Sequence, residues 1–215
     1  MRRTTSHRTV SHRTIIQGMI CAGLMLIACA APALAEDCAE RFARLHVMWY
    51  EVPMSGISRN TSETKGQPKQ ENEFQFAGPG HYLLKMIDPA GGWLLTHDGT
   101  TWQSTDEGAS WKKLYSFDQA DTWQKGLETV QQLATTVRNA VCGEDTVDGE
   151  AVDTLEADMT NTVNASYEIH EKVWVRRSDE RAVRTETLTT GLGPDTFTTQ
   201  TWKHVPDLAI PPAPQ

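Results

Sequence analysis

The chain has 215 residues, with 20 basic and 28 acidic side chains and a formal net charge of −8 at pH 7. Four of the basic residues and none of the acidic ones lie in the first 35 positions, so residues 36–215 carry 16 basic and 28 acidic side chains, a balance of −12. Such an acidic surface argues against nucleic acid and anionic lipid headgroups as partners. The 180 residues suffice for one domain with a sizeable core.

The N-terminus has the three parts of a secretory signal. A positive segment is followed by the apolar run IIQGMICAGLMLIACA and by Ala33-Leu34-Ala35, which predicts cleavage after Ala35 and a periplasmic protein without a transmembrane span. An alternative remains, because Leu26-Ile27-Ala28-Cys29 resembles a lipobox, which would leave a lipoprotein anchored through Cys29. The positive segment consists of Arg2, Arg3, Arg8 and Arg13.

Cysteine usage agrees with export. Cys21 and Cys29 lie in the signal, which leaves Cys38 and Cys142. Two cysteines in an oxidising compartment, without a C-x-x-C motif, predict one structural disulfide.

The first elements after the signal are predicted from periodicity. Cys38, Phe42, Leu45 and Trp49 recur at helical spacing, so a short helix is expected to begin near Asp37. Alternating apolar residues then predict a strand from His46, and the polar segment Ser58–Glu73 is expected to be a mobile loop or a connection between strands. The alternating residues are Met48, Tyr50, Val52 and Met54.

A meander of short antiparallel strands is expected over residues 74–115. Apolar residues alternate in three successive segments, with a turn at 88–92 and a hairpin at Asp98-Gly99. The alternating sets are Phe74 and Phe76; Tyr82, Leu84 and Met86; and Trp93, Leu95 and His97.

A long amphipathic helix is predicted for Gln124–Val141 and is expected to end at Cys142-Gly143. The disulfide would then join the start of the first helix to the end of the second. Strands are expected again at 151–159, 166–177, 182–189 and 196–204, with a turn at 160–164 and a Pro-rich tail over residues 206–215. The predicted domain is therefore 36–205.

The segment Ser104–Trp111 reads Ser-x-Asp-x-Gly-x-Ser-Trp and resembles the Asp-box (BNR) hairpin of sialidases and related β-propellers. A propeller needs several blades of about 40–50 residues, whereas this chain has one full box and two expected helices. Asp106, Gly108 and Trp111 are therefore expected to build a structural turn: the carboxylate accepts from turn amides, the glycine takes an unusual conformation and the indole packs beneath the hairpin.

The order of elements resembles that of the outer-membrane lipoprotein carrier superfamily (LolA/LolB-like), including small exported proteobacterial proteins. Val147–Ala151 is similar to a "v-x-G-x-x-a" element of that family, and Lys172–Val175 with Arg184–Glu186 resembles its "k-x-W-I … r-x-e" strand pair. The usual Leu-Pro between those strands is replaced by Arg181-Ala182-Val183.

This resemblance implies an α+β fold: a strongly curved antiparallel sheet, or half-open barrel, with helices packed on its concave face. It also implies an apolar cavity for acyl chains or a lipidated protein. All seven tryptophans follow the signal, and such a density suits a ligand pocket. The candidate ligand-binding residues are Trp49, Leu84, Met86, Trp93, Leu95 and Trp174.

Two functions remain open from the sequence. One is a non-enzymatic periplasmic carrier of a lipid or lipidated protein. The other is a protein-binding module, an inhibitor or envelope accessory factor, that uses the acidic exterior or Ser58–Glu73 and has a filled core. No catalytic or cofactor motif is found, no metal spacing is found among the histidines, and a monomer is expected. The histidines after the signal are His46, His81, His97, His170 and His204.

Overall fold

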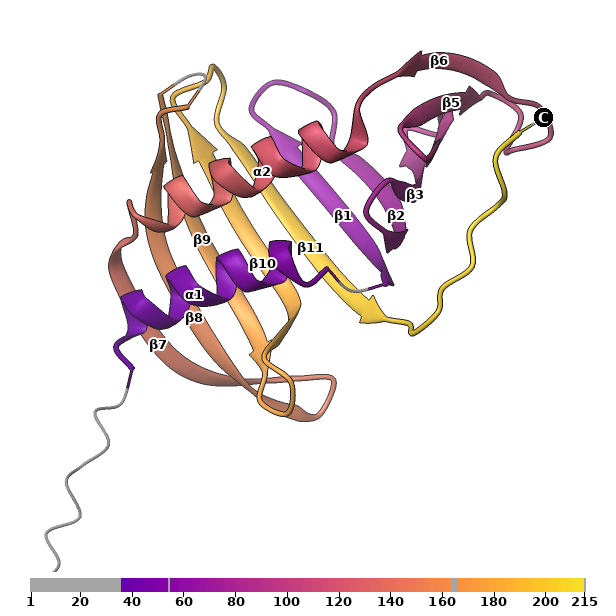
Figure 1. Ribbon diagram of the computed structural model, residues 1–215. Helices are drawn as coiled ribbons and strands as arrows, with labels where there is room; N and C mark the ends of the chain where they lie inside the picture. Colours follow the sequence, from indigo (N-terminus) through magenta and orange to yellow (C-terminus); the bar gives the residue numbers. More distant parts are fainter. Residues whose placement is uncertain (1–35, 54, 164–165, 215) are drawn as a thin grey trace, which may run out of the picture. The chain divides into compact units, whose positions relative to one another are not determined.

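The computed structural model describes residues 36–53, 55–163 and 166–214. They form two helices and eleven strands (Figure 1). The helices are α1 (Cys38–Glu51) and α2 (Gln119–Ala134). The strands are β1 (Gly56–Thr64), β2 (Gln70–Gly78), β3 (His81–Asp88), β4 (Trp93–His97), β5 (Thr100–Ser104), β6 (Lys112–Ser116), β7 (Arg138–Val147), β8 (Glu150–Asn161), β9 (Tyr167–Arg176), β10 (Arg181–Thr190) and β11 (Thr196–His204).

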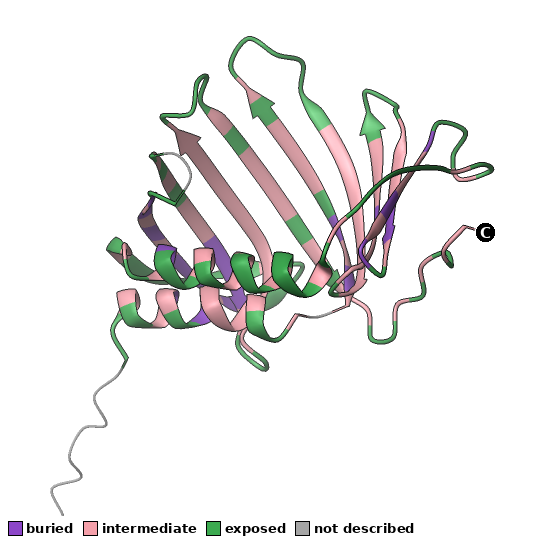
Figure 2. Cartoon of the chain, turned by 45° about the horizontal axis from the view of Figure 1, so that its top comes forward, coloured by how far each residue is buried: buried purple, intermediate pink, exposed green. Residues whose placement is uncertain are grey.

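All eleven strands belong to one antiparallel sheet with the order β6-β5-β4-β3-β2-β1-β11-β10-β9-β8-β7. The sheet does not close, because β6 and β7 are its two edges. It curves strongly, and both helices lie across one face (Figures 1 and 2). The predicted α+β class, a curved antiparallel sheet with helices on the concave face, is therefore confirmed.

The predicted first helix is confirmed, but it is longer than expected. The Asp37 carboxylate caps it by accepting from the Glu40 amide at 2.9 Å. The helix continues to Glu51, so the prediction of a strand from His46 is wrong for Met48 and Tyr50. Met48 and Tyr50 belong to a short alternation of apolar residues, but the apolar stripe at helical spacing, which contains Phe42, Leu45 and Trp49, decides the secondary structure. Met54 lies outside the described residues.

The core lies where the helices cover one end of the sheet. Phe42 and Leu45 of α1 and Leu133 of α2 are buried against β8 and β9. The sheet contributes Leu155, Ala157, Met159, Val173 and Val175. Figure 2 shows these buried segments beneath the helices, whereas the outer surfaces of the helices are exposed. Neither helix in the described part of the chain is long and apolar enough to cross a bilayer.

The prediction of a loop or strand connection over Ser58–Glu73 is wrong for most of the segment, since only residues 65–69 connect two strands. Most of this segment belongs to β1 and β2, which pair with each other in register and occupy the middle of the sheet. Their polar side chains bond across strands: the Asn60 side-chain amide donates to Asn72 at 2.8 Å, and Lys85 donates to Glu73 at 3.2 Å. Contacts with the neighbouring strands thus stabilise β1 and β2, so these strands form without an alternation of apolar residues.

The predicted helix Gln124–Val141 is also wrong in its bounds. The Asp118 carboxylate caps α2 by accepting from the Asp121 amide at 3.0 Å. The helix ends at Ala134, and Arg138–Val147 forms the edge strand β7 instead. Val137 and Val141 continue the helical spacing by coincidence, because the Val141 side chain on β7 is 61% exposed. The edge strand has no outer neighbour, so its alternation of buried and exposed residues is weak.

The predicted disulfide is confirmed, but its second half lies in a different element. Cys38 at the start of α1 is bonded to Cys142 on β7, with the Cα atoms 5.6 Å apart. The bond therefore ties the first helix to an edge strand and not to the end of a second helix. A disulfide fits an exported protein.

The strands predicted in the C-terminal third are confirmed as β8 to β11. Residues 205–214 contain no helix or strand, as expected for the Pro-rich tail. The signal, its cleavage after Ala35 and the alternative anchor at Cys29 lie outside the described residues.

The Asp-box segment forms the turn between β5 and β6. The Ser104 hydroxyl accepts from the Gly108 amide at 2.7 Å, and Asp106 accepts from the hydroxyl and the amide of Ser110 at 2.6 and 2.8 Å. The hydrogen bonds that Asp106 accepts, led by that of the Ser110 hydroxyl and followed by that of the Ser104 hydroxyl, lower the pKa of Asp106 to about 2. Gly108 has a φ of +89°, and a side chain there would meet the rings of Trp93 and Trp111.

Candidate ligand-binding cavity

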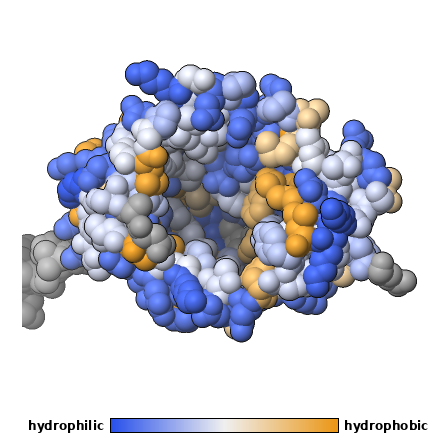
Figure 3. All heavy atoms as spheres, turned by 90° about the horizontal axis from the view of Figure 1, so that it is seen from above, coloured by the Kyte–Doolittle hydropathy of each residue, from blue (hydrophilic) through white to orange (hydrophobic). Residues whose placement is uncertain are grey.

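A cavity of about 410 Å³ lies between the helices and the sheet. The hollow opens at the surface, and Figure 3 shows it from above with apolar residues gathered beside it. The lining comes from α1, α2 and strands β2, β9, β10 and β11. It consists of His46, Trp49, Tyr50, Pro53, Phe74, Phe76, Trp123, Val130, Glu171, Arg181, Ala182, Thr185, Thr187, Thr198, Gln200, Trp202 and His204.

Aromatic side chains form one part of this lining. The rings of Tyr50 from α1 and Trp123 from α2 stack with centroids 4.4 Å apart, and the Tyr50 hydroxyl donates to the Trp123 carbonyl at 3.4 Å. Gly126 permits this approach, because a Cβ at that position would lie 1.8 Å from the Tyr50 hydroxyl. Burial raises the pKa of Tyr50. The Trp49 indole is held in place by donating to the Glu180 carbonyl at 2.7 Å.

The sheet closes the aromatic part from below. Phe74 and Phe76 of β2 point to the same face as Trp202 of β11, because the register brings Ser58 of β1 opposite both Phe74 and Trp202. The cavity therefore has six aromatic side chains from four elements, a composition typical of sites for apolar or ring-shaped ligands.

The floor between these aromatic residues is polar. Thr185 pairs directly with Gln200, and Thr187 pairs with Thr198, across β10 and β11. These four side chains present hydroxyl and amide groups to the cavity. A ligand that fills the cavity would therefore meet rings on one side and hydrogen-bonding groups on the other.

A buried carboxyl group completes the floor. The Glu171 side chain is 13% exposed, and its row on β9 also contains the packed residues Ile169 and Val173. Its nearest polar neighbours are His46, with Nδ1 3.5 Å from Oε2, and the Thr187 hydroxyl, which donates to Oε1 at 3.5 Å. Among the described residues, Oε2 has no hydrogen-bond partner. Burial raises the pKa of Glu171, and the charge of His46 acts in the opposite direction.

His204 is a second polar group at the cavity. Its Nε2 lies 2.9 Å from the Ala182 carbonyl, to which it donates, whereas Nδ1 is buried and has no partner in the described part of the chain. Burial lowers the pKa of His204. The neutral ring therefore presents an acceptor nitrogen.

The structure brings one of the six predicted ligand-binding residues to this cavity, namely Trp49. Leu84 and Met86 lie on the same face of the sheet as Phe74 but on β3, outside the lining. Trp93 and Leu95 of β4 pair with Lys85 and Leu83 of β3. Because these partners alternate with Leu84 and Met86, Trp93 and Leu95 point to the opposite face.

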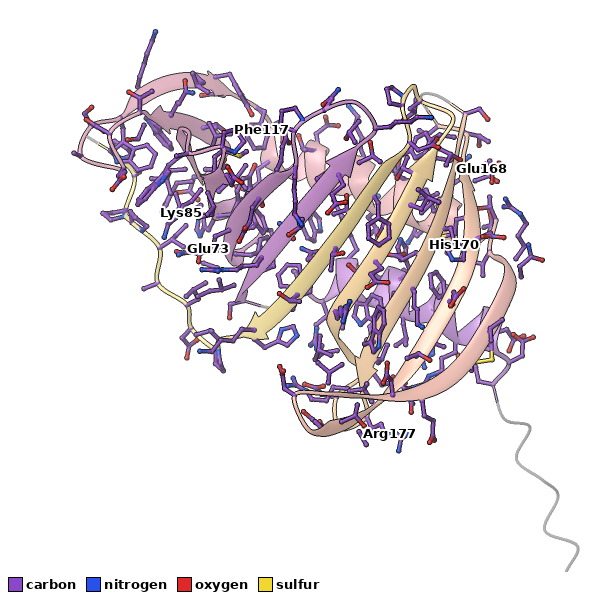
Figure 4. All side chains as sticks on the ribbon, turned by 180° about the vertical axis from the view of Figure 1, so that it is seen from behind. Glu73, Lys85, Phe117, Glu168, His170 and Arg177 are labelled. Carbon is purple, nitrogen blue, oxygen red and sulfur yellow. A yellow bond between two sulfur atoms is a disulfide. The ribbon has the colours of Figure 1, made fainter. Side chains whose placement is uncertain are left out.

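Trp174 also lies on the opposite face. Its indole donates to Asp145 at 2.8 Å, and the side chains of Lys172 and Arg184 lie over its ring. Figure 4 views the molecule from behind and so shows this face directly, with charged side chains such as Glu73 and Lys85 on it. Aromatic content identified the kind of site but did not decide which face each tryptophan occupies.

Several lining residues were missed for local reasons. Tyr50 was assigned to a strand, and Trp123 stands one residue before the predicted second helix. Trp202 and the four polar floor residues lie on predicted strands, but only the pairing of β10 with β11 brings them together. A helical assignment of the whole segment 38–51 would have placed Trp49 and Tyr50 on one helix instead of on opposite faces of a strand.

Three metal-binding side chains meet on the face of β3 and β4 away from the cavity. His81 and His97 are direct cross-strand partners, and their rings stack at 4.2 Å. His81 Nε2 lies 2.7 Å and His97 Nδ1 3.0 Å from the Asp98 carboxylate. Two imidazoles and a carboxylate are typical ligands of divalent transition metals.

No protein-family model matches the chain, and no curated protein matches it in sequence. Among solved structures, a LolA superfamily protein, NE2245 from Nitrosomonas europaea, is 8% identical over 80% of this chain and 94% of its own, with a TM-score of 0.33. An outer-membrane lipoprotein-sorting protein domain from Vibrio parahaemolyticus is 11% identical over 76% and 91%, with a TM-score of 0.30.

The complex of Pseudomonas aeruginosa MucA and MucB matches at 17% identity over 79% of this chain, with a TM-score of 0.43. This chain spans 58% of the length of that matched chain. These likenesses concern the fold alone, and no ligand or partner is transferred from them. The half-open, helix-covered sheet is described directly by the structure.

Proposed function

We propose that the protein is a non-enzymatic binder, or carrier, of a hydrophobic ligand, and that it acts in the periplasm after export. The observation that supports this proposal is the open cavity of about 410 Å³ with its six aromatic side chains. Apolar rings that line a hollow remain available to a ligand, even where two of them stack on one another, as Tyr50 and Trp123 do.

The size of the cavity suits a ligand of moderate affinity. A ligand that buries about 300 Å² of apolar surface gains about 7–8 kcal/mol, which corresponds to micromolar dissociation before ordering costs are subtracted. Such an affinity allows uptake and release, as a carrier requires.

The chemistry of the lining favours binding over catalysis. The described residues that line the cavity include neither serine nor cysteine, and the hydroxyl beside the Glu171–His46 pair, that of Thr187, makes only a long hydrogen bond of 3.5 Å to Glu171 and none to His46. The signal-like N-terminus and the Cys38–Cys142 disulfide support the periplasmic location. Of the two surfaces that the sequence offered for a protein-binding module, Ser58–Glu73 belongs mostly to two paired strands of the sheet, and only residues 65–69 form a loop.

The apolar probe N-phenylnaphthylamine tests the proposal. Its fluorescence is expected to rise on addition of protein and to saturate at one probe per chain, with a dissociation constant on the order of micromolar. Alkyl amphiphiles are expected to displace it. Absence of saturable uptake, together with a native mass spectrum of the empty protein, would favour the protein-binding alternative.

A further inference from the structure

The cavity contains a buried carboxylate oxygen that no group in the described structure satisfies. Glu171 lines the cavity, its Oε2 is buried without a hydrogen bond among the described residues, and His46 Nδ1 lies 3.5 Å from that oxygen. Leaving a buried polar atom unpaired costs about 1–3 kcal/mol, and more for a charged group. Apolar residues occupy the same row of β9 on either side, so the fold itself does not need a carboxyl group there.

The surroundings of Glu171 define which polar group would satisfy it. Its neighbours across the sheet are Ala157 on β8 and Thr187 on β10, and the Thr187 hydroxyl already donates weakly to Oε1. An ionised carboxylate only accepts hydrogen bonds. For the ionised form, which a nearby donor favours, the missing partner is therefore a donor, and a donor carried by a ligand would make a charge-assisted bond.

The other end of the cavity has a different character. His204 bonds to Ala182 at this end, and Glu171 pairs with Thr187 at the other end. Ala182 and Thr187 are five residues apart on β10, which corresponds to about 17 Å at the rise of a strand. Arg181 lies at the His204 end, where its guanidinium donates to the Val52 carbonyl at 2.9 Å. One head group cannot reach both ends, and an anionic head group would favour the Arg181 end.

We propose that Glu171 is the polar anchor of the cavity and recognises an amphiphile whose head group donates hydrogen bonds, as hydroxyls or as an amine. This inference rests on the proposed function. The apolar part of the ligand lies along Trp49, Tyr50 and Trp123, and the hydroxyl and amide floor extends the contact with a hydroxylated head. A fatty acid is disfavoured at Glu171, because its carboxylate brings a second set of acceptors and a like charge.

Three ligands with the same alkyl chain test this preference by displacing N-phenylnaphthylamine at about pH 8, which favours the ionised carboxylate. They are octyl glucoside below its micellar concentration, octylamine and octanoate. At least one of the first two is expected to bind about tenfold or more tightly than octanoate. The stronger of the two identifies the head group as hydroxylated or amino.

Glu171→Gln is expected to bring the three affinities to within about threefold of one another, because it keeps the shape but removes the charge. The matched control is Glu168→Gln on the exposed face of β9, which is expected to keep the preference. Octanoate binding as tightly as the other two, or a preference that survives Glu171→Gln, would overturn the inference. Probe uptake without any head-group preference defeats this inference alone, whereas loss of probe uptake defeats the proposed function.

A second inference comes from the opposite face of the sheet. The coordinating atoms of His81, His97 and Asp98 all lie within 4.8 Å of one another, and both imidazoles are half-buried. Ligand atoms around a tetrahedral zinc ion lie about 3.3 Å apart, so small side-chain movements suffice. Asp98 has a φ of +46° in the turn before Gly99, and this places its carboxylate beside both rings.

We infer that these three side chains form a surface site for Zn²⁺ or Cu²⁺, with the remaining coordination positions open to solvent. Titration calorimetry of tag-free protein tests this, since a histidine tag would bind the same ions. His97→Ala and Asp98→Asn are each expected to weaken binding about tenfold or more, and Asn tolerates the left-handed backbone at position 98. His170→Ala, which removes a histidine beside Glu156 and Asp158, is the control and is expected to change little. Absence of saturable binding, or affinity unaffected by His97→Ala, would overturn the site.

Discussion

Replacing Thr185 by tryptophan is expected to weaken uptake of N-phenylnaphthylamine about tenfold or more. Thr185 lies in the middle of the cavity floor on β10, opposite Gln200 of β11. An indole at this position takes up a large part of the 410 Å³ that the ligand needs. The folded protein has room for it, so the free energy of unfolding is expected to change by less than about 1 kcal/mol.

The matched control is Thr190→Trp, at the end of the same strand and on the opposite face. This variant is expected to bind the probe as the wild type does. The measurements are a fluorescence titration for binding and urea unfolding for stability. Equal binding by the wild type and Thr185→Trp would mean that the probe binds elsewhere.

Removal of the disulfide by Cys38→Ala and Cys142→Ala is expected to lower the free energy of unfolding by about 4–5 kcal/mol. The bond joins residues 104 positions apart and therefore restricts a long loop in the unfolded chain. In the folded protein it ties α1 to β7, an edge strand whose residues are mostly exposed. The Arg41–Asp153 ion pair, at 2.8 Å, still links α1 to β8 after the change.

Denaturant unfolding of the oxidised wild type and the double variant measures this effect. The reduced wild type is the control, and it is expected to match the double variant. A difference of less than about 1 kcal/mol between the oxidised protein and the variant would show that loop closure does not govern stability here.

The sequence predicts the fold well where a pattern is local. The turn at Asp98-Gly99, the Asp37 start of α1 and the alternation of β3 and β4 each depend on a few neighbouring residues, and each is confirmed. The disulfide could be predicted because only two cysteines follow the predicted signal, and it is confirmed.

The failures have a common physical cause. β1 and β2 are polar strands in the middle of the sheet, and only pairing with β11 and β3 distinguishes them from a loop. Val137 and Val141 continue the spacing of α2, yet Thr135 and Thr136 end the helix and β8 takes up the following segment as its partner. In both segments tertiary pairing overrides the local pattern.

The candidate site was harder to predict than the fold. Trp49 and Trp174 look alike in sequence, but one lines the cavity and the other lies on the opposite face against Asp145. Nothing in the sequence indicates that Glu171 lines a site, because a glutamate on a strand is ordinary until its neighbours are known to bury it. The face of each strand, and therefore the lining, follows only from the register across β9, β10 and β11.

Tryptophan fluorescence gives the most direct test that the concave cavity holds the ligand. Addition of a bromoalkyl glucoside is expected to quench the wild-type emission to a plateau, because Trp49, Trp123 and Trp202 line the cavity. With these three residues changed to phenylalanine, the ligand is expected to bind while most of the quenching disappears. Saturable quenching that survives in the triple variant, through Trp93 or Trp174 on the opposite face, would contradict binding in the cavity.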